Sequence, residues 1–165
     1  QSFQFFYDII SPQSDLPKLS KGPDLFVKIV EDMHKKNNKV EVLLTGLRRD
    51  YVMKELRRMN IKYYYFNMVS IEEINKLYNC LDLYIVSSRC EGGPRAVVEC
   101  GLTKTPIIST RVGIAPELMH EESLFDSNNW KSYELAKPNM GFLYDKVRHL
   151  TTYSHKKEFL KMLLN

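Results

Sequence analysis

A polar loop over residues 87–94, with the sequence SSRCEGGP, precedes a helix-like segment and could bind an anion. Gly92 and Gly93 let a ligand approach the backbone closely. Pro94 suits the start of the helix that follows. Helix N-termini attract anions because their backbone N–H groups are unpaired and the helix dipole is positive there. The loop therefore predicts a site for a phosphate or a similar anion.

Charged side chains around this loop add a second kind of chemistry. Arg95, in the first helical turn, opposes the helix dipole unless a bound phosphate pairs with it. Glu91 and Glu99 are separated by seven residues, so both can face one cleft. Carboxylates repel phosphate but accept hydrogen bonds from sugar hydroxyls. The same residues would also suit a plain strand-to-helix turn followed by a solvated glutamate, and spacing alone leaves both interpretations open.

Strand-like and helix-like segments alternate before and after the loop. The strands are expected over residues 3–10, 40–44, 61–66, 83–86 and 106–109, and the helices over residues 23–36, 52–59, 70–81 and 95–102. This alternation predicts an α/β fold, a Rossmann-like parallel sheet flanked by helices. Ligands bind such sheets beyond the carboxyl ends of the strands, which is where residues 87–94 lie.

Two segments carry more detailed expectations. Ser70 and Glu73 form a capping box at the start of the third helix. The buried stripe of that helix is expected to be Ile71, Ile74, Tyr78 and Leu81. After Glu121 the periodicity weakens, and the rest of the chain is predicted to be mostly helical.

Length and composition predict a single domain over residues 1–165. The chain is 44% hydrophobic and 27% charged, which excludes a disordered tail or a fibre. No apolar run approaches the roughly 18 residues of a membrane span. The chain begins with Gln1 rather than Met, and we expect it to be a fragment or a processed product.

Charge and cysteine content are compatible with an anionic small ligand in a reducing compartment. The net charge is only +4, lower than most dedicated nucleic-acid domains carry. Cys80, Cys90 and Cys100 form no CxxC pair, and the four histidines show no metal-ligand spacing, so no metal site is expected. Free thiols favour a cytoplasmic protein.

Six short motifs, in order over about residues 20–120, resemble those of retaining GT-B glycosyltransferases of the group 1 family. They are KGPD at 21–24, VSIEE at 69–73, LDLYIVSS at 81–88, EGGPRAVVECG at 91–101, TPIIST at 105–110 and VGIAPE at 112–117. The resemblance implies the C-terminal, donor-binding half of a two-domain enzyme whose N-terminal acceptor domain is absent from this chain. It implies transfer of a hexose from a nucleotide-diphosphate sugar with retention, without a cofactor or metal. The acceptor would be a glycan, a lipid or a protein, and the full-length protein could associate with a membrane.

The resemblance also assigns roles to individual residues. Glu91 would be the catalytic residue and contact hydroxyls of the donor sugar, while Glu99 would hold the ribose. The other donor-binding residues would be Lys21, Gly92, Gly93, Pro94 and Arg95 around the diphosphate and Gly113 near the nucleotide, with the base near residues 67–69. A lysine and a helix N-terminus can stabilise a diphosphate leaving group without a metal.

The sequence departs from the family pattern at a few positions. Leu16 stands where the family commonly has an arginine, five residues before Lys21, and either Lys18 or Arg95 could replace that charge. Ile114 replaces the second glycine after Gly113, which could crowd the donor pocket or shift the turn.

Two other functions remain open on sequence grounds. A nucleic-acid-binding module could use a basic face together with neighbouring aromatic residues that stack on bases. That face comprises Arg48, Arg49, Lys54, Arg57 and Arg58, beside Tyr63, Tyr64 and Tyr65. The missing arginine at position 16 would also suit a Rossmann-like interaction domain that has lost catalysis.

Overall fold

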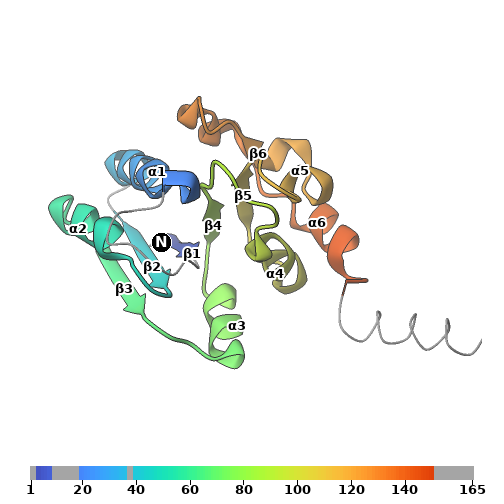
Figure 1. The fold of residues 1–165 in the computed structure, drawn as a ribbon, viewed down its shortest axis with the longest axis horizontal. Helices are drawn as coiled ribbons and strands as arrows, with labels where there is room; N and C mark the ends of the chain where they lie inside the picture. Colours follow the sequence, from blue (N-terminus) through green and yellow to red (C-terminus); the bar gives the residue numbers. More distant parts are fainter. Residues whose placement is uncertain (1–2, 9–18, 37–38, 151–165) are drawn as a thin grey trace, which may run out of the picture.

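The computed structural model describes residues 3–8, 19–36 and 39–150. Within these ranges, six parallel strands form one sheet in the order β3-β2-β1-β4-β5-β6 (Figure 1). The strands are β1 (Phe3–Asp8), β2 (Val40–Thr45), β3 (Lys62–Phe66), β4 (Leu83–Val86), β5 (Ile107–Thr110) and β6 (Leu124–Phe125). The predicted Rossmann-like parallel sheet is confirmed.

Helices connect successive strands, as parallel pairing requires. The connecting helices are η1 (Leu19–Lys21), α1 (Pro23–Lys36), α2 (Asp50–Arg58), α3 (Ile71–Asn79), α4 (Arg95–Thr103), α5 (Ala115–Leu118) and η2 (Glu121–Ser123). Two further helices, η3 (Trp130–Leu135) and α6 (Met140–Val147), follow β6. The predicted Ser70–Glu73 capping box is present: each side chain bonds to the backbone N–H of the other residue.

The sheet separates two hydrophobic clusters, one on each face. Helices α1 and α2 pack on one face with η3, while α3, α4, α5 and α6 pack on the other. Alternate residues of β4 enter different clusters: Ile85 faces α1, whereas Tyr84 and Val86 face α4. This period-2 pattern is the one expected for a strand buried on both faces.

After Glu121 the described residues are mostly helical, as predicted, in η2, η3 and α6. They also contain the short strand β6, which was not predicted and which forms an edge of the sheet. A strand of two residues is too short to produce a visible period. The prediction that Ile71 is buried was wrong: Ile71 is 83% exposed, because α3 packs through its last turn, where Tyr78 is buried, and its first turn extends into solvent.

The point where the sheet changes its winding direction lies between β1 and β4, since β1 pairs with β2 on one side and β4 on the other. The segment before α1 meets the loop after β4 there: the backbone N–H groups of Arg89 and Cys90 both donate to the carbonyl of Ser20, at 2.7 and 3.1 Å. Open α/β sheets bind ligands at this switch point.

Residues 9–18 and 151–165, including Leu16 and Lys18, lie outside the described residues.

Candidate functional site

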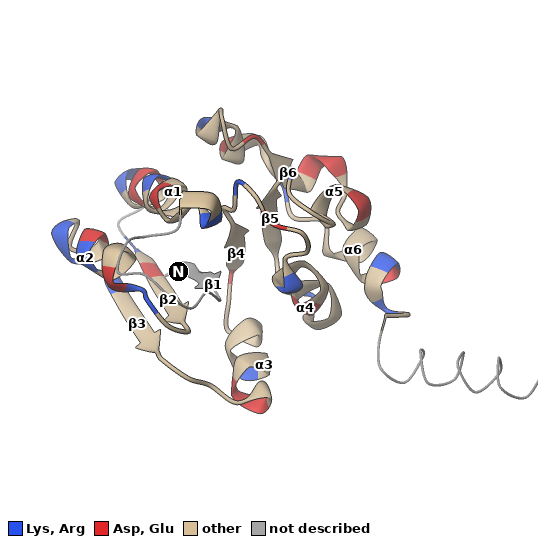
Figure 2. Ribbon diagram, viewed as in Figure 1, with Lys and Arg blue, Asp and Glu red and all other residues tan. Residues whose placement is uncertain are grey.

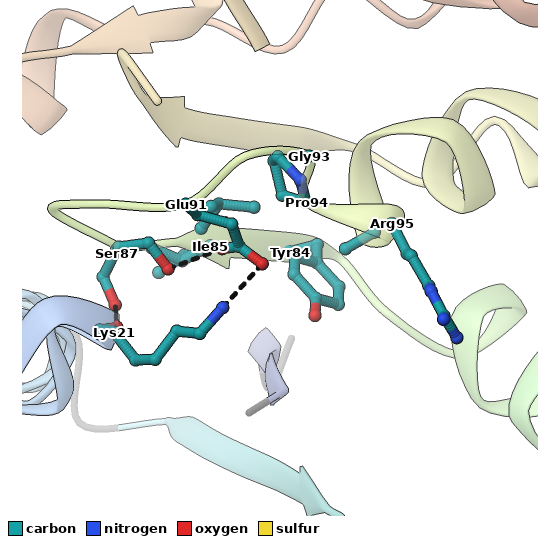
Figure 3. Close-up of a pocket in the computed structure, with 11 residues that line it drawn as sticks. Lys21, Tyr84, Ile85, Ser87, Glu91, Gly93, Pro94 and Arg95 are labelled. Carbon is teal, nitrogen blue, oxygen red and sulfur yellow. Dashed lines mark hydrogen bonds and ion pairs between the residues drawn. The ribbon is translucent and has the colours of Figure 1, made fainter. Parts of the chain in front are cut away.

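A cavity of about 210 Å³ lies at the switch point and brings together residues from the two loops (Figure 3). Predicted site residues line it: Lys21 from η1, Glu91 from the loop after β4, and Gly93, Pro94 and Arg95 at the start of α4. The strand residues Tyr84, Ile85 and Val86 form its remaining wall together with Ser87, Ser88 and Ala96. The sequence thus predicted five of the residues that surround this cavity.

Glu91 is held from two sides. Its Oε1 lies 2.7 Å from the ammonium group of Lys21, and its Oε2 accepts a hydrogen bond of 2.8 Å from the hydroxyl of Ser88. Figure 3 shows the Lys21 and Glu91 side chains pointing toward each other across the cavity. Each side chain is about one-fifth exposed, so solvent and small ligands can reach both. This arrangement places one cation and one fixed carboxylate on the same small cavity.

A second ion pair pins the two loops together beside the cavity. The Arg89 guanidinium donates two hydrogen bonds of 2.7 Å to the carboxylate of Asp24 and one of 3.0 Å to the carbonyl of Leu19. Burial raises the pKa of Asp24, but the hydrogen bonds and the charge of Arg89 outweigh burial and leave that pKa below its usual value. Arg89 therefore ties the segment that carries Lys21 to the loop that carries Glu91.

Two glycines allow backbone segments to meet where no side chain would fit. Gly22 has a φ of +63°, and a Cβ on it would lie 1.8 Å from the carbonyl oxygen of Ser87. Gly113 has a φ of +49°, and a Cβ there would lie 2.3 Å from the carbonyl oxygen of Gly92. Positive φ values are strained for residues with a Cβ. The predicted site residues Gly92 and Gly113 are therefore neighbours that shape the loop around Glu91.

The N-terminus of α4 faces the cavity without a capping side chain. Pro94 is its N-cap residue, with extended backbone and no side-chain hydrogen bond. Arg95 is exposed, and Figure 3 shows it extending away from the Lys21–Glu91 pair. Ile114 packs beside Gly93: its nearest side-chain atom would lie 3.9 Å from a Cβ placed there, which is an ordinary contact.

Glu99 lies one turn further along α4 and does not border the cavity. Its Oε2 accepts a hydrogen bond of 2.5 Å from the hydroxyl of Tyr78 on α3. Sequence reasoning placed Tyr78 in the core and assigned no role to Tyr84, which lines the cavity and stacks on the Tyr78 ring at 5.7 Å. The sequence signal for this contact was that Tyr78 and Tyr84 lie on α3 and β4, the two elements that precede the helix carrying Glu99.

The predicted basic face is not a continuous cationic surface. Arg49 is buried, with 1% of its surface exposed, and its Nε donates to the carbonyl of Thr45, which corrects its assignment to that face. Arg57 donates to the Tyr63 hydroxyl, and Arg58 pairs with an acidic neighbour on the same helix. Basic and acidic segments also adjoin along α1, α2 and α3 in Figure 2.

Residues 3–8, 19–36 and 39–150, which the structure describes, contain no group of three or more His, Cys, Asp or Glu residues arranged to hold a metal ion. None of the helices in those ranges has the length and apolar character needed to cross a membrane.

Several solved structures share this fold. Sucrose-phosphate synthase from Thermosynechococcus elongatus superposes with a TM-score of 0.72 and 14% identity, over 99% of this chain and 45% of that one. Staphylococcus aureus TarM, in a complex with UDP, gives a TM-score of 0.64 and 16% identity over 89% of this chain and 29% of that one. The C-terminal domain of a group 1 family glycosyl transferase from Francisella tularensis gives a TM-score of 0.67 and 16% identity, over 92% of this chain and 86% of that one.

This chain thus spans less than half of the sucrose-phosphate synthase chain and shares the fold of one part of it. No curated protein sequence matches the chain significantly. Residues 14–137, which make up more than half of the chain, match the family described as "Glycosyl transferases group 1". The sequence motifs, the parallel sheet with its cavity at the switch point, and this match agree, and the chain belongs to the group 1 glycosyl transferase family, with the fold of one half of a GT-B enzyme.

Proposed function

We propose that the chain is the nucleotide-sugar-binding half of a retaining glycosyltransferase that transfers a hexose. The observation that carries this proposal is the cavity at the switch point, where Lys21, Glu91 and the N-terminus of α4 meet. A lysine and a helix N-terminus attract a diphosphate, and a carboxylate accepts hydrogen bonds from a sugar. A nucleotide-diphosphate sugar carries both the diphosphate and the sugar hydroxyls.

The roles follow from the positions of the residues. Lys21 and the backbone of residues 92–95 would neutralise the diphosphate as it leaves, so that the charge formed in the transition state meets a preorganised positive region. Glu91, fixed by Lys21 and Ser88, is the proposed catalytic residue that contacts the donor sugar. Glu99 would hold the ribose, and Gly113 would support the loop near the nucleotide. In this proposal the protein's own charges replace a metal or cofactor.

The size of the cavity supports a site shared with a second domain. About 210 Å³ is below the roughly 300–1,000 Å³ of most small-molecule sites. A facing domain would enlarge and close the cleft, and we propose that it also binds the acceptor, a glycan, a lipid or a protein. By itself the chain should bind a donor weakly and should not catalyse transfer.

The direct test is titration calorimetry of the 165-residue chain with UDP, GDP, ADP and the hexose conjugates of each. We expect one base to be preferred and Lys21→Gln to weaken its binding. Lys28→Gln, which alters an exposed lysine on α1, is the matched control and should bind like the wild type. Absence of binding to every compound would contradict a donor site. If the chain alone transferred a sugar faster than the Glu91→Ala variant, the proposal that a second domain is needed for catalysis would be contradicted.

A further inference from the structure

We propose that Tyr78 is a positioning residue for nucleotide recognition, whose hydroxyl orients the Glu99 carboxylate toward the ribose. This inference rests on the proposed function, in which Glu99 binds the ribose hydroxyls. Tyr78 lies on α3, outside the six motifs found in the sequence. Its role would explain how Glu99, which does not border the cavity, can contribute to specificity.

The contact between the two residues is short and sheltered. The Tyr78 hydroxyl donates to Glu99 Oε2 at 2.5 Å, and Tyr78 is only 2% exposed. Among the described residues, no other side chain donates to the Glu99 carboxylate, so Oε1 retains its capacity to accept a ligand hydroxyl. Hydrogen bonds to an ionised acceptor are shorter and stronger than neutral ones. One oxygen is thus anchored while the other can face a ribose.

Tyr78 is itself held by its neighbours. Its ring stacks on Tyr84, which lines the cavity, and its backbone carbonyl accepts a hydrogen bond of 3.0 Å from Thr105. The Thr105 hydroxyl lies 2.7 Å from that of Thr103, and Thr103 donates to the carbonyl of Glu99. Contacts of the two threonines with the backbone carbonyls thus hold the turn of α3 that carries the Tyr78 phenol next to the turn of α4 that carries the Glu99 carboxylate.

Anchoring matters because a glutamate side chain has several rotatable bonds. Ordering such a side chain during binding costs free energy that reduces affinity. When the hydroxyl of Tyr78 has already fixed the carboxylate in the folded protein, the ribose meets an oriented acceptor. The expected effect is therefore on discrimination between ligands with and without ribose hydroxyls, rather than on binding of the diphosphate.

Tyr78 also has a structural role that the test must separate. It is the buried residue of α3, so its ring attaches that helix to the rest of the protein. The substitution Tyr78→Phe keeps the ring and its stacking and removes only the hydroxyl. Tyr133→Phe is the matched control, because the Tyr133 hydroxyl donates to the Asp32 carboxylate, also at 2.5 Å, from a side chain that is 5% exposed and packs on the opposite face of the sheet.

The measurement compares a nucleoside diphosphate with the matching 2′,3′-dideoxynucleoside diphosphate, which lacks both ribose hydroxyls. The nucleoside diphosphate is whichever of UDP, GDP and ADP binds most tightly. The measured ratio is the dissociation constant of the dideoxy ligand divided by that of the ribose ligand. A hydrogen bond to a charged group predicts a wild-type ratio of about 10 or more. We expect Tyr78→Phe to lower this ratio about threefold or more, and Tyr133→Phe to leave it unchanged. Glu99→Gln should lower it too, and adding Tyr78→Phe to Glu99→Gln should lower it no further, because the hydroxyl acts through the carboxylate.

The outcomes separate the two proposals. If the wild type binds none of the three diphosphates, the proposed function fails. If the wild type discriminates and Tyr78→Phe discriminates equally well, the positioning role is overturned. A crystal structure of the wild-type chain with the diphosphate gives a test that needs no variant. The role requires Tyr78 and the ribose to bond to Glu99 together, and a ribose that displaces the Tyr78 hydroxyl would overturn it.

Discussion

The ammonium group of Lys21 lies 2.7 Å from the carboxylate of Glu91, although Lys21 precedes α1 and Glu91 follows β4. The pair connects the two loops of the cavity and balances their charges. Each partner also keeps the other directed into the cavity, so a long lysine side chain and a glutamate side chain are ordered together. A diphosphate and a sugar would then meet a site whose charges are already in place.

Removing the charge of Lys21 and removing that of Glu91 should have different effects on the binding of nucleoside diphosphate. Lys21→Gln removes the cation, so binding of the preferred nucleoside diphosphate should weaken about fivefold or more, the equivalent of about 1 kcal/mol. Glu91→Gln removes a negative charge next to the diphosphate, so the same ligand should bind at least as tightly as to the wild type. Calorimetric titration of both variants measures the difference. Equal weakening by the two substitutions would show that Glu91 does not act as a charge beside the diphosphate.

The conformation of the loop around Glu91 should depend on Gly113. Gly113→Ala places a Cβ 2.3 Å from the carbonyl oxygen of Gly92 at a φ of +49°, so the backbone must shift. We expect a loss of about 2 kcal/mol in the free energy of unfolding, together with weaker binding of nucleoside diphosphate. Urea unfolding and calorimetry measure the two effects.

Gly92→Ala is the control for that substitution, since a Cβ at Gly92 has no atom within 4 Å. It adds the same methyl group one residue from Glu91 and should change the free energy of unfolding by less than about 0.5 kcal/mol. If the two alanine variants were equally destabilised, close contact with the Gly92 carbonyl would not be the reason that position 113 requires glycine.

The stability conferred by Asp24 should depend on pH. Arg89 holds the pKa of Asp24 below its usual value of 3.8 despite burial. The carboxylate therefore stabilises the fold at pH values above 3.8, and this contribution is lost as the pH falls through the lower pKa of the folded state. Asp24→Asn should cost about 1 kcal/mol at pH 7, and the difference from wild type should shrink below pH 3.8.

Urea unfolding between pH 2.5 and 7 provides the measurement, with the pH range chosen to bracket that value. Glu117→Gln changes an exposed carboxylate on α5 and should differ little from wild type at every pH. A constant difference between Asp24→Asn and wild type over the whole range would argue that the Arg89–Asp24 pair does not contribute to stability through charge.

The three thiols should differ in reactivity. Cys80 and Cys90 are exposed, whereas Cys100 is fully buried in α4, and burial raises its pKa well above the usual value. Only a thiolate attacks a disulfide reagent efficiently. Ellman's reagent should therefore modify two thiols in the native protein and the third after unfolding in urea. Rapid reaction of all three without denaturant would contradict the packing of α4 against the sheet.

Most of the sheet could be predicted because its strands are short apolar runs between well-marked helices. The segment 83–86 is uninterrupted by charge, and Pro23 and Ser70 mark helix starts through local chemistry. Strand β6 could not be predicted, because its two residues are too few to show a period and only their pairing with β5 defines them as a strand. Ile71 was misassigned because helical periodicity identifies a face of a helix but not how far along the helix its neighbours extend.

The site was predictable where its residues are adjacent in sequence and less so where they meet through tertiary packing. Glu91 and Pro94 belong to one loop, and the motif placed them on the cavity. The contact between Tyr78 and Glu99 depends on how α3 packs against α4, and no local pattern encodes that packing. Arg49 is buried although both of its immediate neighbours are charged, and its side chain folds back to the carbonyl of Thr45, four residues earlier. Charge patterning alone does not indicate this local contact.

The approach of Gly22 to the Ser87 carbonyl has a practical meaning for protein engineering. A single added methyl group would overlap that oxygen, so the backbones of the two segments fit each other with no tolerance. Neither segment can be exchanged alone without disturbing the other. A chimera designed to alter the ligand preference of the cavity would have to transplant residues 19–24 and 87–91 together, although more than sixty residues separate them in the chain.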